Sequence, residues 1–331
     1  MTSSTCWYCS SPSTAPLSKC SSCDLAAYCN RQCQLAHWPV HRAACGSGVV
    51  IAESSSKGAG LGIVALRDFA GGQLVLSEKP VISVPHDCDL DELEETMARP
   101  GSAVNSLKPA TKAALFMLFD RYQSRNDDRK TFTGILETNG IPHGVDGCVG
   151  GLFLFLSRLN HSCAPNCARS WNDDLQREEL IALCDIAKGE ELTSAYFDII
   201  DDRPHRRKHA LELFEFECMC DACRLETDDT WKRKAKEHDD LFQENMTLGN
   251  FTKALEHAES RLKLLKDNDW NNPGDFSRTY FDAYTASREF KQKAKTLEFI
   301  TKAIEMSALI GMENHVDTKM MRRLKGELLS S

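Results

Sequence analysis

The chain has 331 residues, of which 42% are apolar, and a formal net charge of -8. These values suit a globular protein of two or three domains. No run of about 18 apolar residues occurs, so we expect neither a membrane span nor a membrane partner. The opening sequence MTSSTCWYCSS lacks the basic and then apolar pattern of a secretory leader, so we expect the protein in the nucleus, the cytoplasm or both.

The charge is unevenly distributed. Residues 51–230 contain 19 basic and 31 acidic side chains, a net charge of -12. A surface of this sign attracts basic peptides and repels nucleic acid, although the charge could also serve solubility alone. Residues 1–50 contain only three Lys or Arg, which disfavours DNA binding through this part of the chain.

Eight zinc-capable residues occur within the first 45 positions. A stretch this short buries too little apolar surface to fold alone, and zinc binding can supply the missing free energy. Tetrahedral zinc takes four thiolate or imidazole ligands, so eight ligands predict two closed sites. These ligands are Cys6, Cys9, Cys20, Cys23, Cys29, Cys33, His41 and Cys45. Fifteen cysteines in a chain without a leader, several of them in C-x2-C pairs, also indicate metal binding in a reducing compartment.

Alternating apolar residues and turn signals predict a strand-rich middle of the chain. The predicted strand segments are 49–54, 61–69, 73–84, 179–186 and 191–197. A glycine turn at 57–60 separates the first two segments. Apolar periodicity predicts helices at 89–99 and 108–123. The apolar stretch 151–160 is buried, but its pattern does not decide between helix and strand.

From about residue 228 the pattern is helical throughout. The segment 295–307 echoes 253–265 at an offset of 42 residues. The echo indicates stacked helix pairs of the tetratricopeptide type. Unrelated amphipathic helices that pack together are an equal alternative.

A second cysteine group has the spacing C-x-C-x2-C and comprises Cys218, Cys220 and Cys223. Three thiolates are one ligand short of a closed zinc site. Cys163 in the stretch Asn160–Cys163 is the leading candidate for the fourth ligand, and Cys167 is its main rival. A reduced cluster without metal fits the spacing less well.

Together these motifs resemble those of the SET and MYND domain (SMYD-like) protein-lysine methyltransferases. The N-terminal cysteine array, with its Trp38-x2-His41 element, resembles a MYND zinc finger. The remaining matches are the 58–60 glycine turn, the 158–163 stretch, the Gly189–Leu192 turn with Tyr196, and the Cys218 triplet, which resemble a SET domain with its post-SET zinc site.

The resemblance implies an α+β fold with four parts. We expect a MYND finger at 1–48, a SET β-fold at 49–200 with a helical insert at about 85–145, a post-SET zinc region at 201–227 and a helical, tetratricopeptide-like domain at 228–331. Three zinc ions are expected, and His37 is the rival of His41. The expected ligand sets are Cys6, Cys9, Cys29, Cys33; Cys20, Cys23, His41, Cys45; and Cys163, Cys218, Cys220, Cys223.

The resemblance also implies S-adenosylmethionine-dependent methylation of a lysine in a histone or non-histone protein. It assigns Tyr196 as the catalytic residue that lines the lysine channel. The implied cofactor-binding residues are Lys57, Ala59, Gly60, Asn139, Asn160, His161, Tyr196 and Phe216. Glu190 and Glu191 are interpreted as turn and scaffold residues.

Two features depart from the animal pattern. The finger precedes the glycine turn and does not interrupt the SET domain after it. The substrate channel has Phe214 where a second tyrosine is common, which predicts addition of more than one methyl group or else weakened activity. The alternative function is an adaptor with an inactive SET fold, because MYND fingers commonly bind proline-containing peptides. We expect a monomer and a substrate lysine in a basic context.

Overall fold

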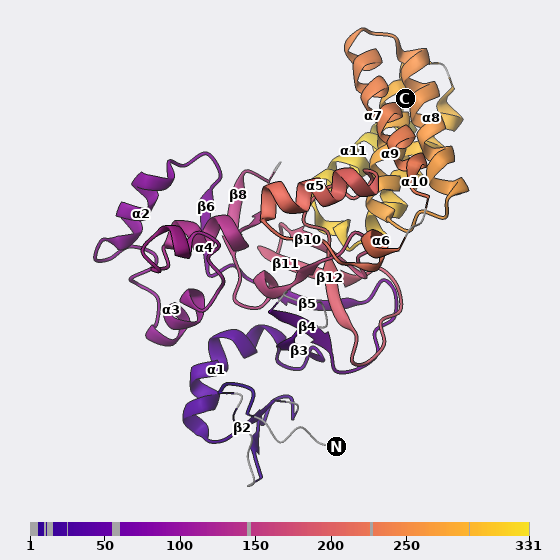
Figure 1. The fold of residues 1–331 in the computed structure, drawn as a ribbon. Helices are drawn as coiled ribbons and strands as arrows, with labels where there is room; N and C mark the ends of the chain where they lie inside the picture. Colours follow the sequence, from indigo (N-terminus) through magenta and orange to yellow (C-terminus); the bar gives the residue numbers. More distant parts are fainter. Residues whose placement is uncertain are drawn as a thin grey trace.

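The computed structural model describes residues 6–9, 11, 16–24, 26–54, 60–143, 147–225, 228–290 and 292–330. Within these ranges, a small N-terminal finger, a central group of sheets and a C-terminal set of helices follow one another along the chain. The finger and the C-terminal helices extend from different sides of the sheets (Figure 1). The predicted α+β class is confirmed. No helix of the described residues combines the length and the hydropathy needed to cross a membrane.

The finger combines a two-stranded ribbon with one helix. Its elements are β1 (Ser18–Lys19), β2 (Ala27–Tyr28) and α1 (Arg31–Ala44). Helix α1 begins after Asn30, whose side-chain oxygen accepts the backbone N–H of Cys33 at 2.9 Å, a favourable N-cap. The buried face of α1 includes Val40, His41 and Ala44. The helix contacts β5 and α3 and so attaches the finger to the rest of the chain.

Three small antiparallel or mixed sheets form the centre. The first contains β3 (Val49–Glu53), β4 (Leu61–Ala65), β12 (Glu191–Ser194) and β9 (Asn160–His161), in this order. The second contains β10 (Cys167–Asn172), β11 (Arg177–Ala182) and β5 (Leu74–Glu78), and the third β6 (Ile82–Pro85), β8 (Val149–Leu152) and β7 (Ile141–His143). Strand β12 pairs antiparallel with β4 and parallel with β9. This pairing brings residues 160–161 beside residues 193–194.

Each predicted strand segment contains a strand, but the apolar stretch 151–160 is not a single element. Strand β8 ends at Leu152, and the 3-10 turn η3 (Leu156–Arg158) precedes β9. The buried carboxylate of Glu78 accepts backbone N–H groups of Leu154, Phe155 and Leu156 at 2.8–3.3 Å. These bonds satisfy buried donors that neither a helix nor a sheet would pair. A turn at this position therefore depends on a side chain 76 residues away from Leu154.

The helical insert contains α2 (Leu90–Ala98), α3 (Pro109–Phe116), the 3-10 turn η1 (Gln123–Arg125) and α4 (Phe132–Asn139). The predicted helix 108–123 is too long, because α3 ends at Phe116. The buried carboxylate of Asp120 explains the change of direction. It accepts the backbone N–H groups of Tyr122 at 2.8 Å and Thr131 at 3.0 Å, which fixes a turn in place of further helix.

After β12, α5 (Arg203–Phe214) and the short α6 (Asp221–Arg224) lead into the C-terminal helices. These are α7 (Thr230–Thr247), α8 (Phe251–Asp267), α9 (Pro273–Ser287), α10 (Lys293–Leu309) and α11 (Val316–Ser330), with the 3-10 turn η4 (Met312–Asn314) before α11. Each helix from α7 to α10 contacts the next helix along the chain. The two segments that echo each other fall on α8 and α10, the second helices of successive pairs. The prediction that the chain is helical from about residue 228 is confirmed for the described residues.

The C-terminal helices contact the β10–β11 hairpin through the segment from Gly311 to Lys319, which joins α10 to the first turn of α11. The backbone N–H of Val316 donates to the Asp173 carboxylate at 3.0 Å, and Lys319 pairs with Asp174 at 2.7 Å. A Cβ on Gly311 would lie only 2.5 Å from a side-chain carbon of Ile181. Backbone and sheet are therefore in direct contact at this point.

A buried acid lies near this junction. Glu178 of β11 is 3% exposed, and its Oε2 has no hydrogen-bond partner among the described residues. Burial raises the pKa of Glu178 to about 7, although the positive charge of Arg169 opposes the shift. The folded protein therefore holds this carboxyl largely protonated below pH 7, while the unfolded chain ionises it near its ordinary value.

We expect Glu178→Gln to stabilise the protein increasingly as the pH rises. Above the unfolded pKa, the Glu178 carboxyl of the unfolded wild-type chain is ionised. Folding must then either take up a proton or bury the charged carboxylate, and this cost reaches its full size above pH 7. Between pH 6 and 8.5, the difference in unfolding free energy between variant and wild type should grow by about 1 kcal/mol. Urea unfolding at several pH values measures it. Glu179→Gln, on the opposite face of β11, is the control, and an equal trend in both variants would contradict the assignment.

Candidate active site and metal centres

Three groups of cysteine and histidine side chains converge in the folded chain. In each group, the four ligand atoms lie within 4.8 Å of one another. The groups are Cys6, Cys9, Cys29, Cys33; Cys20, Cys23, His41, Cys45; and Cys163, Cys218, Cys220, Cys223. They are the same three sets that the sequence predicts. In the finger, the Sγ atoms of Cys9 and Cys29 are 3.7 Å apart and those of Cys20 and Cys45 are 3.9 Å apart. Tetrahedral zinc with bonds of about 2.3 Å requires roughly 3.8 Å between sulfurs, so zinc fits these groups.

The two histidines of α1 have different partners. His41 Nε2 lies 3.5 Å from the Cys23 Sγ and completes the second group. His37 Nδ1 instead lies 3.0 Å from the hydroxyl of Tyr28. The structure therefore brings His41 and not its rival to the ligand set.

The third group joins Cys163, after β9, to Cys218 and Cys220 before α6 and to Cys223 within α6. The Sγ of Cys163 is 3.9 Å from that of Cys218 and 3.5 Å from that of Cys223. The backbone N–H of Cys163 also donates to the Cys220 Sγ at 3.3 Å. Cys167 is buried in β10 and is not part of the group. Four sulfurs at this spacing suit one tetrahedral zinc ion.

His161 connects this cysteine group to Tyr196. Its Nδ1 accepts the backbone N–H of Tyr196 at 3.1 Å, which leaves the proton of the neutral ring on Nε2. Nε2 lies 3.2 Å from the Cys163 Sγ, and the ring stacks on Phe197 at 4.4 Å. Burial lowers the pKa of His161 to about 4, so the ring stays neutral near pH 7. The imidazole thus fixes the backbone at Tyr196 relative to the cysteines.

Tyr196 follows β12 and lies among aromatic rings. It exposes 36% of its surface, yet its hydroxyl points inward and donates to the backbone carbonyl of Leu159 at 2.5 Å. The Phe214 ring centroid is 5.4 Å away and that of Phe216 is 6.4 Å away. Burial raises the pKa of Tyr196 to about 12. The hydroxyl therefore keeps its proton at neutral pH.

The other predicted cofactor residues fall into three classes. Lys57 and Ala59 lie outside the described residues. His161 and Phe216 lie beside Tyr196, with ring centroids 5.3 Å and 6.4 Å from its ring. Asn160 follows Leu159, whose carbonyl the Tyr196 hydroxyl contacts, and it donates to the carbonyl of Leu61, the residue after Gly60, at 3.2 Å. The Asn139 side chain donates to the carbonyls of Phe119 at 2.6 Å and Ile135 at 2.8 Å, and its own carbonyl accepts from the Ser157 hydroxyl at 3.1 Å. The cofactor role of Asn139 stays a prediction.

Comparison with known families agrees with this geometry. Residues 6–45 match the MYND finger and residues 60–197 match the SET domain. This chain is a SET and MYND domain protein. It is 30% identical over 195 residues to the histone-lysine N-methyltransferase set5 of Schizosaccharomyces pombe, covering 59% of this chain and 55% of the relative. It is 25% identical over 224 residues to the N-lysine methyltransferase SMYD2 of Homo sapiens, covering 65% and 50%.

The SET and MYND chain spans about half the length of the curated relatives it matches. Among solved structures, the SET domain of LSMT bound to lysine and AdoHcy matches 90% of each chain, with a TM-score of 0.37 and 10% identity. This score is too low for a transfer of individual residues.

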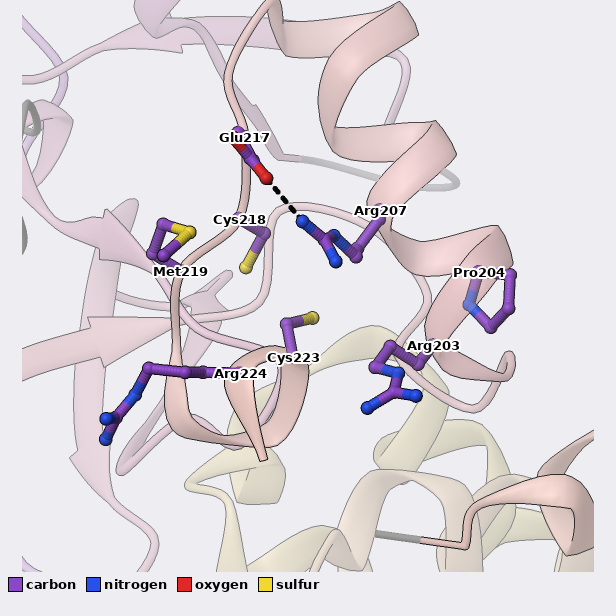
Figure 2. Close-up of a pocket in the computed structure, with 8 residues that line it drawn as sticks. All are labelled: Arg203, Pro204, Arg207, Glu217, Cys218, Met219, Cys223 and Arg224. Atoms are coloured by element: carbon purple, nitrogen blue, oxygen red, sulfur yellow. Dashed lines mark hydrogen bonds and ion pairs between the residues drawn. The ribbon is translucent and has the colours of Figure 1, made fainter. Parts of the chain in front are cut away.

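A cavity of about 490 Å³ lies beside the third cysteine group of this SET and MYND protein, and Figure 2 shows its lining. Cys218 and Cys223 form part of its wall, together with Arg203, Arg207 and Arg224. Two of these guanidinium groups are paired with carboxylates: Arg207 with Glu217, which also lines the cavity, and Arg224 with Asp221 at 2.8 Å. None of the predicted cofactor residues lines this cavity. Residues 55–59 lie outside the described residues.

Glu191, which the sequence analysis interprets as a scaffold residue, lies with two residues that it missed, Ser54 and Gly62. The Glu191 carboxylate accepts hydrogen bonds from Ser54 Oγ at 2.8 Å and Asn160 Nδ2 at 2.8 Å. A Cβ on Gly62 would lie 2.3 Å from a Glu191 oxygen. The Gly189–Leu192 motif did mark Glu191, but the strand order that places it beside Asn160 is a long-range property that no local pattern contains.

We expect Cys163→Ser to lower the bound zinc by one equivalent relative to wild type, because serine is a poor ligand for zinc. Cys167→Ser, four residues away in β10, should leave the zinc content unchanged. Elemental analysis of the purified proteins measures both. The assignment of Cys163 is wrong if the two variants retain equal zinc, or if Cys167→Ser alone loses an equivalent.

Proposed function

We propose that this chain is an S-adenosylmethionine-dependent protein-lysine N-methyltransferase. The observation that carries the proposal is the position of Tyr196, which His161 ties to the third cysteine group while its hydroxyl donates to the Leu159 carbonyl. Two relatives whose names include lysine methyltransferase activity support it. When bound, S-adenosylmethionine supplies a methyl group on a positively charged sulfonium.

The residues near Tyr196 suit such a cofactor. Gly60 has a φ of +69°, which side chains rarely tolerate, and a Cβ there would meet no atom of the described residues within 4 Å. A ligand can therefore approach the backbone at this position. We assign the adenine face to Phe216, and the methionine part to Asn160, His161 and the backbone around Gly60. The assignments of Lys57, Ala59 and Asn139 are part of the same proposal.

The chain's own groups would prepare the substrate lysine. The rings of Tyr196, Phe214 and Phe216 form an apolar surround, and removal of water lowers the pKa of an amine that enters it. A neutral amine is the nucleophile that methyl transfer requires. The Leu159 carbonyl and the Tyr196 hydroxyl are an acceptor and a donor within hydrogen-bond distance of each other, so they can align the amine.

We expect Tyr196→Phe to lower methyl transfer by roughly 10²-fold, because one positioned hydrogen-bond donor is lost. Zinc content should stay unchanged. The measurement is transfer of labelled methyl from S-adenosylmethionine to a panel of proteins and basic peptides. Tyr280→Phe, in the C-terminal helical domain, is the matched control. Equal transfer by wild type and Tyr196→Phe, or none by wild type, would overturn the catalytic assignment.

We propose that Phe214 permits more than one methyl addition. Its ring lies 5.4 Å from that of Tyr196 but offers no hydroxyl to hold the amine or a water molecule. The wild-type enzyme should therefore form di- or trimethyl-lysine, and Phe214→Tyr should shift the products toward monomethyl-lysine. Mass spectrometry of the modified peptide distinguishes these products. Monomethyl-lysine alone from both proteins would contradict this role.

The substrate and the partners are proposals of the same kind. The net charge of -12 over residues 51–230 favours a lysine in a basic sequence. Tyr8, Leu35 and Trp38 are exposed on the finger, which supports binding of a proline-containing peptide there. We further propose three bound zinc ions, a monomer in the nucleus or cytoplasm, and domain limits at residues 48, 200 and 227.

The exposed finger side chains also favour an adaptor as the second candidate function. Calorimetry with S-adenosylhomocysteine separates the two, because a SET fold that has lost its activity through decay of the cofactor site will not bind the nucleoside.

A further inference from the structure

Glu191 is the first residue of β12, between the β3–β4 hairpin and β9. Its strand neighbours are Val64 on one side and, two residues further along, Asn160 on the other. The side chain therefore lies between two segments that contain predicted cofactor residues: Gly60 directly before β4, and Asn160 with His161 in β9. These segments are 99 residues apart between Leu61 and Asn160.

The Glu191 carboxylate joins both segments directly. Ser54, at the end of β3, donates its hydroxyl to both carboxylate oxygens at 2.8 and 2.9 Å. Asn160 donates from Nδ2 to Oε1 at 2.8 Å and to the carbonyl of Leu61 at 3.2 Å. Gly62 permits this approach, because a Cβ there would lie 2.3 Å from Oε1 and 2.9 Å from the Asn160 Nδ2.

We propose that Glu191 is a positioning residue for the cofactor site, which rests on the function proposed above. Its carboxylate fixes the distance between Ser54, directly after β3, and the carboxamide of Asn160. Charged acceptors form stronger hydrogen bonds than neutral ones, so the junction is well defined. A negative charge at this position also favours a cationic nucleoside over a neutral one. Glu191 acts through Ser54 and Asn160, and the catalytic geometry at Tyr196 depends instead on His161.

The neighbouring glutamate provides a matched control. Glu190 lies in the same turn, but its carboxylate accepts from Asn166 Nδ2 at 3.1 Å and from the backbone N–H of Ala187 at 3.1 Å. Within the part of the chain that the structure describes, its carboxylate bonds neither to the hairpin nor to Asn160, although its backbone carbonyl accepts the N–H of Ala65 at 2.9 Å. Glu190→Gln removes the same charge one residue away and should affect the turn alone.

The test is calorimetry of the zinc-loaded protein with S-adenosylhomocysteine, beside steady-state kinetics with S-adenosylmethionine. Glu191→Gln should weaken binding of S-adenosylhomocysteine by about tenfold and raise the KM for S-adenosylmethionine at least as much, with kcat changed less than twofold. Glu190→Gln should match wild type in both. Ser54→Ala, which removes one contact and keeps the carboxylate, should give a smaller loss in the same direction. Glu191→Asp serves if Glu191→Gln does not fold, as judged by its zinc content and melting temperature.

The proposal fails if Glu191→Gln, or Glu191→Asp in its place, binds the nucleoside within twofold of Glu190→Gln. It also fails if kcat falls while KM stays constant, since that result would assign Glu191 to the chemical step. If wild type itself does not bind S-adenosylhomocysteine, the proposed function fails and this inference fails with it. Loss of binding in Glu191→Gln alone, with wild-type binding intact, separates the two cases.

Discussion

Four sulfur atoms hold together two parts of the chain that are otherwise far apart. Cys163 follows β9, whereas Cys218, Cys220 and Cys223 lie 55 to 60 residues further along. Between them lie the β10–β11 hairpin, β12 and α5. Without a cation, four thiols this close would repel one another as they ionise, and with zinc they form a closed site. His161 Nε2 contacts the Cys163 sulfur and its Nδ1 accepts the Tyr196 backbone N–H, so the position of this cysteine group sets that of Tyr196 and the aromatic rings around it.

A second constraint is the satisfaction of buried polar groups by acids that are distant in the sequence. Glu78 accepts the backbone donors of the turn before β9, Asp120 directs the insert, and Glu191 joins β3 to Asn160. Each carboxylate replaces regular secondary structure where the chain must turn beside the site. Such bonds to charged acceptors are costly to break, because the partner N–H group or carboxylate would stay buried without a partner. The irregular segments around Tyr196 therefore have fixed conformations despite their short elements.

The ease of predicting each feature follows from how local its cause is. Zinc ligands are determined by residue type and spacing, so the sequence could predict all three groups, including His41 over His37. The sequence pattern favoured Cys163 as the fourth ligand and left Cys167 as its rival, and the structure decides between them because Cys167 is buried in β10 apart from the group. The helix 108–123 was predicted too long, since the Asp120 bonds that end it depend on Thr131. The bonds of Glu191 to Ser54 and Asn160 could not be predicted, because they depend on β12 lying between β4 and β9.

The junction between the helical domain and the β10–β11 hairpin has a consequence for the way the molecule can be divided. Gly311 lies against Ile181 so closely that no side chain fits, and Asp173 caps the start of α11 by accepting the Val316 N–H. Ile181 is apolar and 4% exposed, so removal of the segment around Gly311 would expose this buried side chain of β11 to water. The segment around Gly311 and the start of α11 thus cover part of β11, and a shortened chain that ends before them would expose apolar surface and be prone to aggregation.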